Sequence, residues 1–80
     1  MIDYEKIALQ YARKYGYDSV RPAGEKDGLH YFRIYTKALL GHKLGWPQFV
    51  RIAENGSTSR VENMAERSWA VRQEIRLNNL

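Results

Sequence analysis

The stretch LHYFRIYTK, residues 29–37, is rich in aromatic and β-branched residues and alternates in polarity. This alternation predicts a β-strand, because successive side chains of a strand point to opposite faces of a sheet. Phe32 and Ile34 then face the interior, whereas Arg33 and its alternate neighbours face outward. The strand is therefore expected in an antiparallel sheet that has one buried and one solvated face.

Further strands are predicted on both sides of this one. Asp27-Gly28 is typical of a tight hairpin turn, which connects residues 29–37 to an edge strand at residues 18–23. Residues 48–54 show the same alternation and predict another strand. The inward face of the sheet would then consist of Phe32, Ile34, Val50 and Ile52.

Helices are predicted at both ends of the chain. In residues 4–15, apolar residues recur at helical spacing after Asp3, which is a good N-cap. A second helix is predicted over residues 60–77, while residues 57–61 are either a fourth strand or the approach to that helix. The apolar face of the second helix is traced by Val61, Met64, Ala65, Ser68, Val71 and Ile75.

These elements predict one two-layer α+β domain spanning residues 1–80. Its order is a helix, a three- or four-stranded antiparallel sheet and a second helix, with both helices on the Phe32 face of the sheet. A chain of 80 residues is a single small domain.

The charge of the chain is concentrated in its sheet. The net charge is +4, and residues 1–18 and 54–80 are each balanced, so that all of the excess lies in residues 19–53. Cations and aromatic rings alternate on the predicted outer face, and this combination binds phosphates and stacks on unpaired bases in single-strand binders. This face is a candidate nucleic-acid surface. The alternatives are that it is simply solvated or that a second copy of the protein covers it. Its residues are Arg21, Tyr31, Arg33, Tyr35, Lys37, Phe49 and Arg51.

A second candidate is the connection at residues 38–47, which is unusually apolar for a loop. It either caps an open edge of the core or docks a protein partner, since Trp and Leu anchors are typical of interface centres. The candidate partner-binding residues are Leu39, Leu40, Leu44 and Trp46. Arg72 falls within the apolar arc of the second helix, where it either extends over the sheet edge or binds an anion or an acidic partner.

No motif predicts a catalytic, cofactor or metal site. The chain has no cysteine and only two histidines, and Glu62 and Glu66 are expected on a solvated helix face. The lack of cysteine in so small a domain favours the cytoplasm, and the sequence has neither a membrane-spanning run nor an export signal. The predicted function is a non-enzymatic interaction module that self-associates or binds a protein partner through the 38–47 loop and the outer sheet face. The alternative is a nucleic-acid-binding module that uses the basic and aromatic sheet face.

Overall fold

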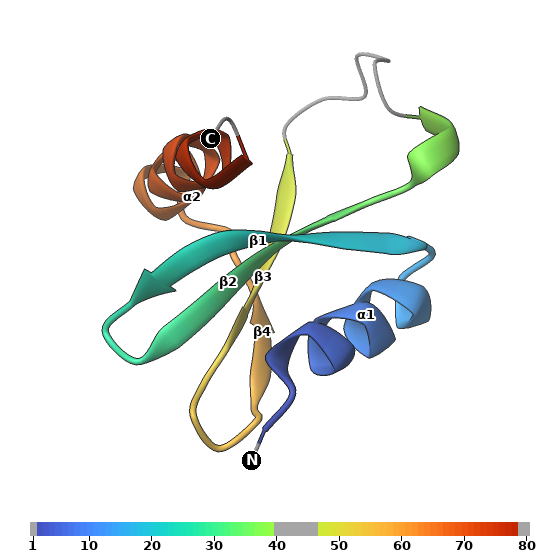
Figure 1. The fold of residues 1–80 in the computed structure, drawn as a ribbon, viewed down its shortest axis with the longest axis horizontal. Coiled ribbons are helices and arrows are strands. Elements are labelled where there is room, and N and C mark those ends of the chain that lie inside the picture. Colours follow the sequence, from blue (N-terminus) through green and yellow to red (C-terminus); the bar gives the residue numbers. More distant parts are fainter. Residues whose placement is uncertain (1, 40–46, 79–80) are drawn as a thin grey trace.

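The computed structural model describes residues 2–39 and 47–78. Figure 1 shows the two helices apart, with the strands passing between them. The predicted α+β class, with helix, antiparallel sheet and helix in that order, is confirmed. The elements are α1 (Tyr4–Lys14), β1 (Ser19–Lys26), β2 (Leu29–Tyr35), the short 3₁₀ helix η1 (Lys37–Leu39), β3 (Gln48–Ile52), β4 (Thr58–Arg60) and α2 (Met64–Asn78).

The sheet has the strand order β1-β2-β3-β4, and each neighbouring pair is antiparallel. β2 is a central strand, with Phe32 opposite Val50 and Arg33 opposite Phe49 on β3. The register between β1 and β2 shifts after Pro22. This proline therefore lies in an irregular edge strand, where its missing N–H costs no ladder hydrogen bond.

Residues 57–61, which the sequence left open, contain the fourth strand. Ser59 of β4 lies opposite Arg51 of β3. The second helix begins only at Met64, and the side chain of Asn63 accepts a hydrogen bond from the N–H of Glu66 at 3.1 Å. Asn63 is therefore the N-cap, and β4 ends three residues before it.

Helix α1 covers the predicted inward face of the sheet. The Asp3 carboxylate accepts a hydrogen bond from the N–H of Lys6 at 3.1 Å and caps the helix. The small residues Ala8 and Ala12 are fully buried and let the helix approach the strands closely. They form one core cluster with Phe32, Ile34, Val50 and Ile52, which confirms the predicted inward residues.

Helix α2 lies on the other face of the sheet, so the prediction that both helices share one face is wrong. Tyr31 and Phe49 are only 2% and 0% exposed, and they cluster with Ala70 of α2. Because adjacent residues of a strand point to opposite faces, this second cluster and the α1 cluster lie on opposite sides. Each helix therefore packs against its own face of the sheet.

The reason for this difference lies in the side of α2 that is buried. The sequence pattern assigned the apolar residues of the helix to its buried side and assigned Glu62 and Glu66 to solvent. In the structure Glu66 and Glu74 bind arginines of the sheet, and Ala70 lies between them on the same side of the helix. The buried side of α2 therefore combines these ion pairs with Ala70 and the partly buried Trp69 and Val71, while Met64 and Ile75 stay exposed.

Among the described residues, no helix is both long enough and apolar enough to cross a membrane.

Candidate functional site

The predicted nucleic-acid face is an interface between the sheet and α2. Tyr31 and Phe49 are buried beneath the helix, so the expectation that their rings face solvent is wrong. Tyr35 is half-buried, with the Arg21 guanidinium 5.5 Å from its ring centroid. Lys37 is exposed at the start of η1, and its N–H donates to the Asp18 carboxylate at 3.0 Å. Bases cannot stack on Tyr31 or Phe49 while α2 covers them.

Glu66 joins α2 to two strands of the sheet. One guanidinium nitrogen of Arg51, Nη1, donates to both carboxylate oxygens of Glu66 at 2.7 Å each, and the Tyr31 hydroxyl donates to the same carboxylate. Burial by itself raises the pKa of Glu66, but the hydrogen bonds from Tyr31 and Arg51 and the charge of Arg51 outweigh it, so the pKa lies below its usual range. Burial and the bond to Glu66 raise the pKa of Tyr31 to about 12.

Glu74 lies about two turns after Glu66 on α2 and makes a second ionic connection to the sheet. Its side chain is 6% exposed, and Arg33 Nη1 donates to its two carboxylate oxygens at 2.9 and 3.2 Å. Arg21 Nη1 lies 3.9 Å from the same carboxylate. Three of the cations that the sequence assigned to a phosphate-binding face are thus engaged within the molecule: Arg51 pairs with Glu66, and Arg33 and Arg21 share Glu74.

A prediction about acid stability follows from Glu66. A carboxyl group whose folded pKa is depressed contributes stability above its ordinary value of 4.5, and this contribution is lost as the pH falls through the lower folded value. Glu66→Gln should be about 1 to 3 kcal/mol less stable than wild type at neutral pH. The variant should also lose less stability than wild type as the pH is lowered below 4.5. Urea unfolding of both proteins across this range measures the difference.

The matched control for this experiment is Glu62→Gln, which removes an exposed carboxylate near the start of the same helix. Part of the acid dependence will remain in every variant, because hydrogen bonds from the Lys37 N–H and the Ser19 hydroxyl lower the pKa of Asp18. Equal acid sensitivity of Glu66→Gln and Glu62→Gln would contradict the role given to Glu66.

The candidate loop lies largely outside the described residues. Leu39 is the last residue of η1, and Leu40, Leu44 and Trp46 are not among the residues that the structure describes. The predicted docking role of this loop therefore stays a prediction.

The surface that α2 turns away from the sheet carries apolar side chains. Met64 and Ile75 are 51% and 54% exposed. With Ser68 and Val71 they form a line at intervals of three and four residues along one side of the helix, which we call the α2 stripe (Met64, Ser68, Val71 and Ile75). Met64, Ser68 and Ile75 are exposed, whereas Val71 is half-buried and also packs against the core cluster beneath α2. A shallow pocket of about 180 Å³ on this side is lined by Met64, Arg67, Ser68, Val71 and Arg72.

Arginines border the α2 stripe. Arg67 is held beside Met64, with Nη2 donating to the Val61 carbonyl at 3.3 Å. Arg72 and Arg76 are exposed, and neither forms an ion pair with any residue in the described ranges. The two expectations for Arg72, extension over the sheet edge and binding of an anion or an acidic partner, stay predictions; Arg72 is exposed and lines the pocket beside the stripe.

Sequence reasoning missed Glu66, Glu74 and the exposure of the α2 stripe. One signal was present: Glu66, Ala70 and Glu74 recur every four residues and so share one side of a helix. Whether that side faces water or arginines depends on how the helix docks, and no local pattern encodes this.

No protein-family model, curated protein or solved structure matches this chain. Among the residues that the structure describes, no three His, Asp or Glu side chains gather where they could hold a metal ion.

Proposed function

We propose that this chain is a small non-enzymatic interaction module that binds an acidic segment of a protein partner on the α2 stripe. The observation that carries the proposal is the orientation of α2, which turns its carboxylates Glu66 and Glu74 to the sheet and leaves Met64 and Ile75 exposed. Exposed apolar side chains at helical spacing are the usual anchors of helix-mediated recognition.

Charge complementarity favours an acidic partner. The stripe is bordered by Arg67 and Arg72, and Arg76 is exposed one turn beyond Arg72, while Glu66 and Glu74 are already paired with sheet arginines. A partner with apolar side chains flanked by carboxylates would bury the stripe and pair with these arginines at its rim. A second copy of this helix would instead bring like charges together, which disfavours self-association at this surface.

The proposal predicts selective binding of an acidic peptide. A synthetic helical peptide with an apolar stripe flanked by glutamates should bind, and the same peptide with lysines in place of the glutamates should not. Met64→Ser combined with Ile75→Ser should weaken binding about thirtyfold, because each substitution forfeits about 1 kcal/mol of apolar burial. Arg72→Glu should also weaken binding of the acidic peptide and strengthen binding of the lysine peptide. Fluorescence anisotropy of the labelled peptides measures both effects.

Ile2→Ser is the matched control, because it removes an exposed apolar side chain that lies outside α2. Equal binding of the two peptides, or of neither, would refute the proposal. A dimer seen by light scattering that the Met64→Ser, Ile75→Ser variant dissociates would identify a second copy as the occupant and would overturn the acidic partner.

We keep the cytoplasm as the proposed location, because the sequence contains no cysteine to form the disulfides common in small secreted domains. Nucleic-acid binding is the second candidate function. The observation that favours it is no longer the sheet face but a groove on the opposite side of the molecule.

A further inference from the structure

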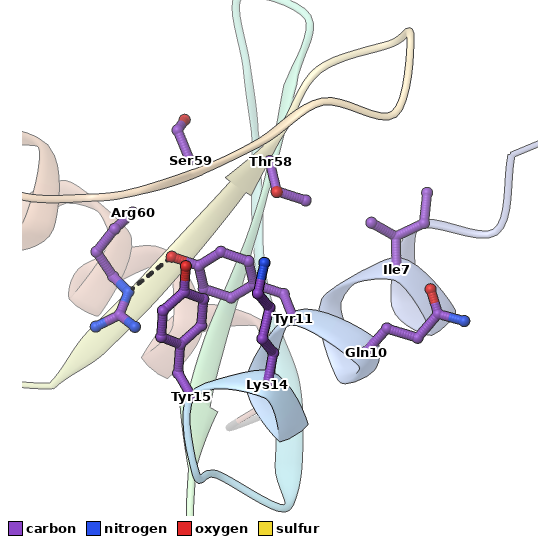
Figure 2. Close-up of a pocket in the computed structure, with 8 residues that line it drawn as sticks. All are labelled: Ile7, Gln10, Tyr11, Lys14, Tyr15, Thr58, Ser59 and Arg60. Atoms are coloured by element: carbon purple, nitrogen blue, oxygen red, sulfur yellow. Dashed lines mark hydrogen bonds between the residues drawn. The ribbon is translucent and has the colours of Figure 1, made fainter.

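A groove of about 470 Å³ runs between α1 and the edge strand β4. Figure 2 shows Tyr11, Lys14, Tyr15 and Arg60 gathered in it, with Ile7 further along the helix. None of the described side chains that line this groove is acidic. The groove lies on the α1 face of the sheet, so it is separate from the α2 stripe.

Arg60 is a cation whose partners among the described residues are all neutral. Its Nε donates to the Tyr11 hydroxyl at 3.1 Å, and its Nη1 donates to the Gln48 side-chain oxygen at 3.3 Å. Its guanidinium carbon lies 5.4, 5.2 and 5.8 Å from the ring centroids of Tyr11, Tyr15 and Tyr17. These contacts fix the orientation of the guanidinium, and no carboxylate in the described residues forms an ion pair with it.

Arg60 differs from the other strand arginines in the partners that it contacts. Arg21, Arg33 and Arg51 each reach a carboxylate of α2, whereas Arg60 is half-buried among rings and amides. A partly desolvated charge without a counter-ion favours the binding of an anion. Because the Arg60 guanidinium is already oriented, the binding of an anion there costs little free energy for ordering this side chain.

The other residues of the groove indicate which chemical groups the ligand has besides its anionic group. Lys14 supplies a second cation, with its Nζ 5.8 Å from the Tyr15 ring centroid. The Tyr15 side chain is 51% exposed, so part of its ring is open to stacking. Thr58 adds a hydroxyl, and Ile7 adds an apolar surface. Two cations beside an accessible aromatic ring fit a phosphate attached to a planar, partly apolar body.

We propose that the α1–β4 groove binds a nucleoside phosphate, with Arg60 and Lys14 on the phosphate and Tyr15 against the base. The same chemistry is offered by a free mononucleotide and by one nucleotide of a single strand. The site does not depend on the α2 stripe, so either proposal can fail without the other.

The test follows backbone amide NMR shifts during titration at low salt with inorganic phosphate, uridine monophosphate and a short oligouridylate. Uridine monophosphate should shift the amides of residues 11–16 and 58–61 and should bind more tightly than inorganic phosphate. Tighter binding of the oligouridylate identifies a single strand as the source of the ligand, and equal affinity identifies the free nucleotide.

Two variants and one control assign the site. Lys14→Ala lies on an exposed position and should weaken binding about threefold to tenfold, whereas Lys6→Ala removes the same charge from an exposed position of the same helix outside the groove and should have no effect. Arg60→Gln should weaken binding by tenfold or more. If Arg60→Gln does not fold, the comparison of Lys14→Ala with Lys6→Ala decides alone.

Three results would overturn the proposal. The first is the absence of shifts at millimolar nucleotide, and the second is equal weakening by Lys14→Ala and Lys6→Ala. The third is binding of inorganic phosphate as tight as that of uridine monophosphate, because the Tyr15 ring would then contribute nothing to binding.

Discussion

Phe49→Ala is expected to lower the free energy of unfolding by about 3 to 5 kcal/mol, because it empties a fully buried aromatic site in the core beneath α2. Phe32→Ala should cost a similar amount on the α1 side, where Phe32 is 8% exposed. A small domain has only about 5 to 15 kcal/mol of stability in total, so either change removes a large part of it. Denaturant unfolding followed by circular dichroism measures both values.

The comparison of these two variants tests the arrangement of the helices. With both helices on one face, Phe49 would lie on a solvated face and Phe49→Ala would have little effect. Met64→Ala is the control, since Met64 is 51% exposed and its loss should change stability by no more than about 0.5 kcal/mol. A Phe49→Ala variant as stable as Met64→Ala would show that α2 does not cover this face.

Arg33→Met is the second change with a large expected effect, a loss of about 3 kcal/mol. It removes the closest cation from the Glu74 carboxylate, whose side chain is 6% exposed, and breaking a buried ion pair from one side leaves a poorly compensated charge. The value is at the lower end of the range for buried pairs because the Arg33 side chain is 32% exposed. Urea unfolding at neutral pH measures the loss.

A double variant separates this ionic effect from lost packing. Arg33→Met combined with Glu74→Leu should be more stable than Arg33→Met alone, because the double replacement also removes the buried carboxylate that has lost Arg33. Arg72→Met serves as the control for charge, since Arg72 is exposed and has no ion pair in the described ranges. Arg33→Met and Arg72→Met variants of equal stability would be evidence against an energetic role for the Glu74 pair.

The candidate sites were less accessible to sequence reasoning than the fold was. Tyr31 and Arg33 were correctly assigned to one face of β2, yet that face is covered and its arginines are paired with residues as far as 41 positions away along the chain. The α1–β4 groove brings Lys14 and Tyr15 beside Arg60, and no local pattern connects positions so far apart. Each of these sites arises where separate elements meet.

The sequence by itself determined the local elements. The alternation in residues 29–37 specified β2 and the Phe32 side of the core, Asp27-Gly28 specified a tight turn, and Asp3 specified the start of α1. These features depend on backbone geometry and on neighbours within a few residues, which the sequence displays directly.

Tertiary structure alone decided which side of α2 is buried. The local pattern of that helix favoured burial of Met64 and Ile75, but Glu66 and Glu74 find arginine partners on β2 and β3. Hydrogen-bonded ion pairs at the sheet, together with burial of Tyr31 and Phe49, are available only with the carboxylate side facing inward. A helix pattern records the polarity of side chains, whereas the partner that compensates each charge exists only once the strands are in place.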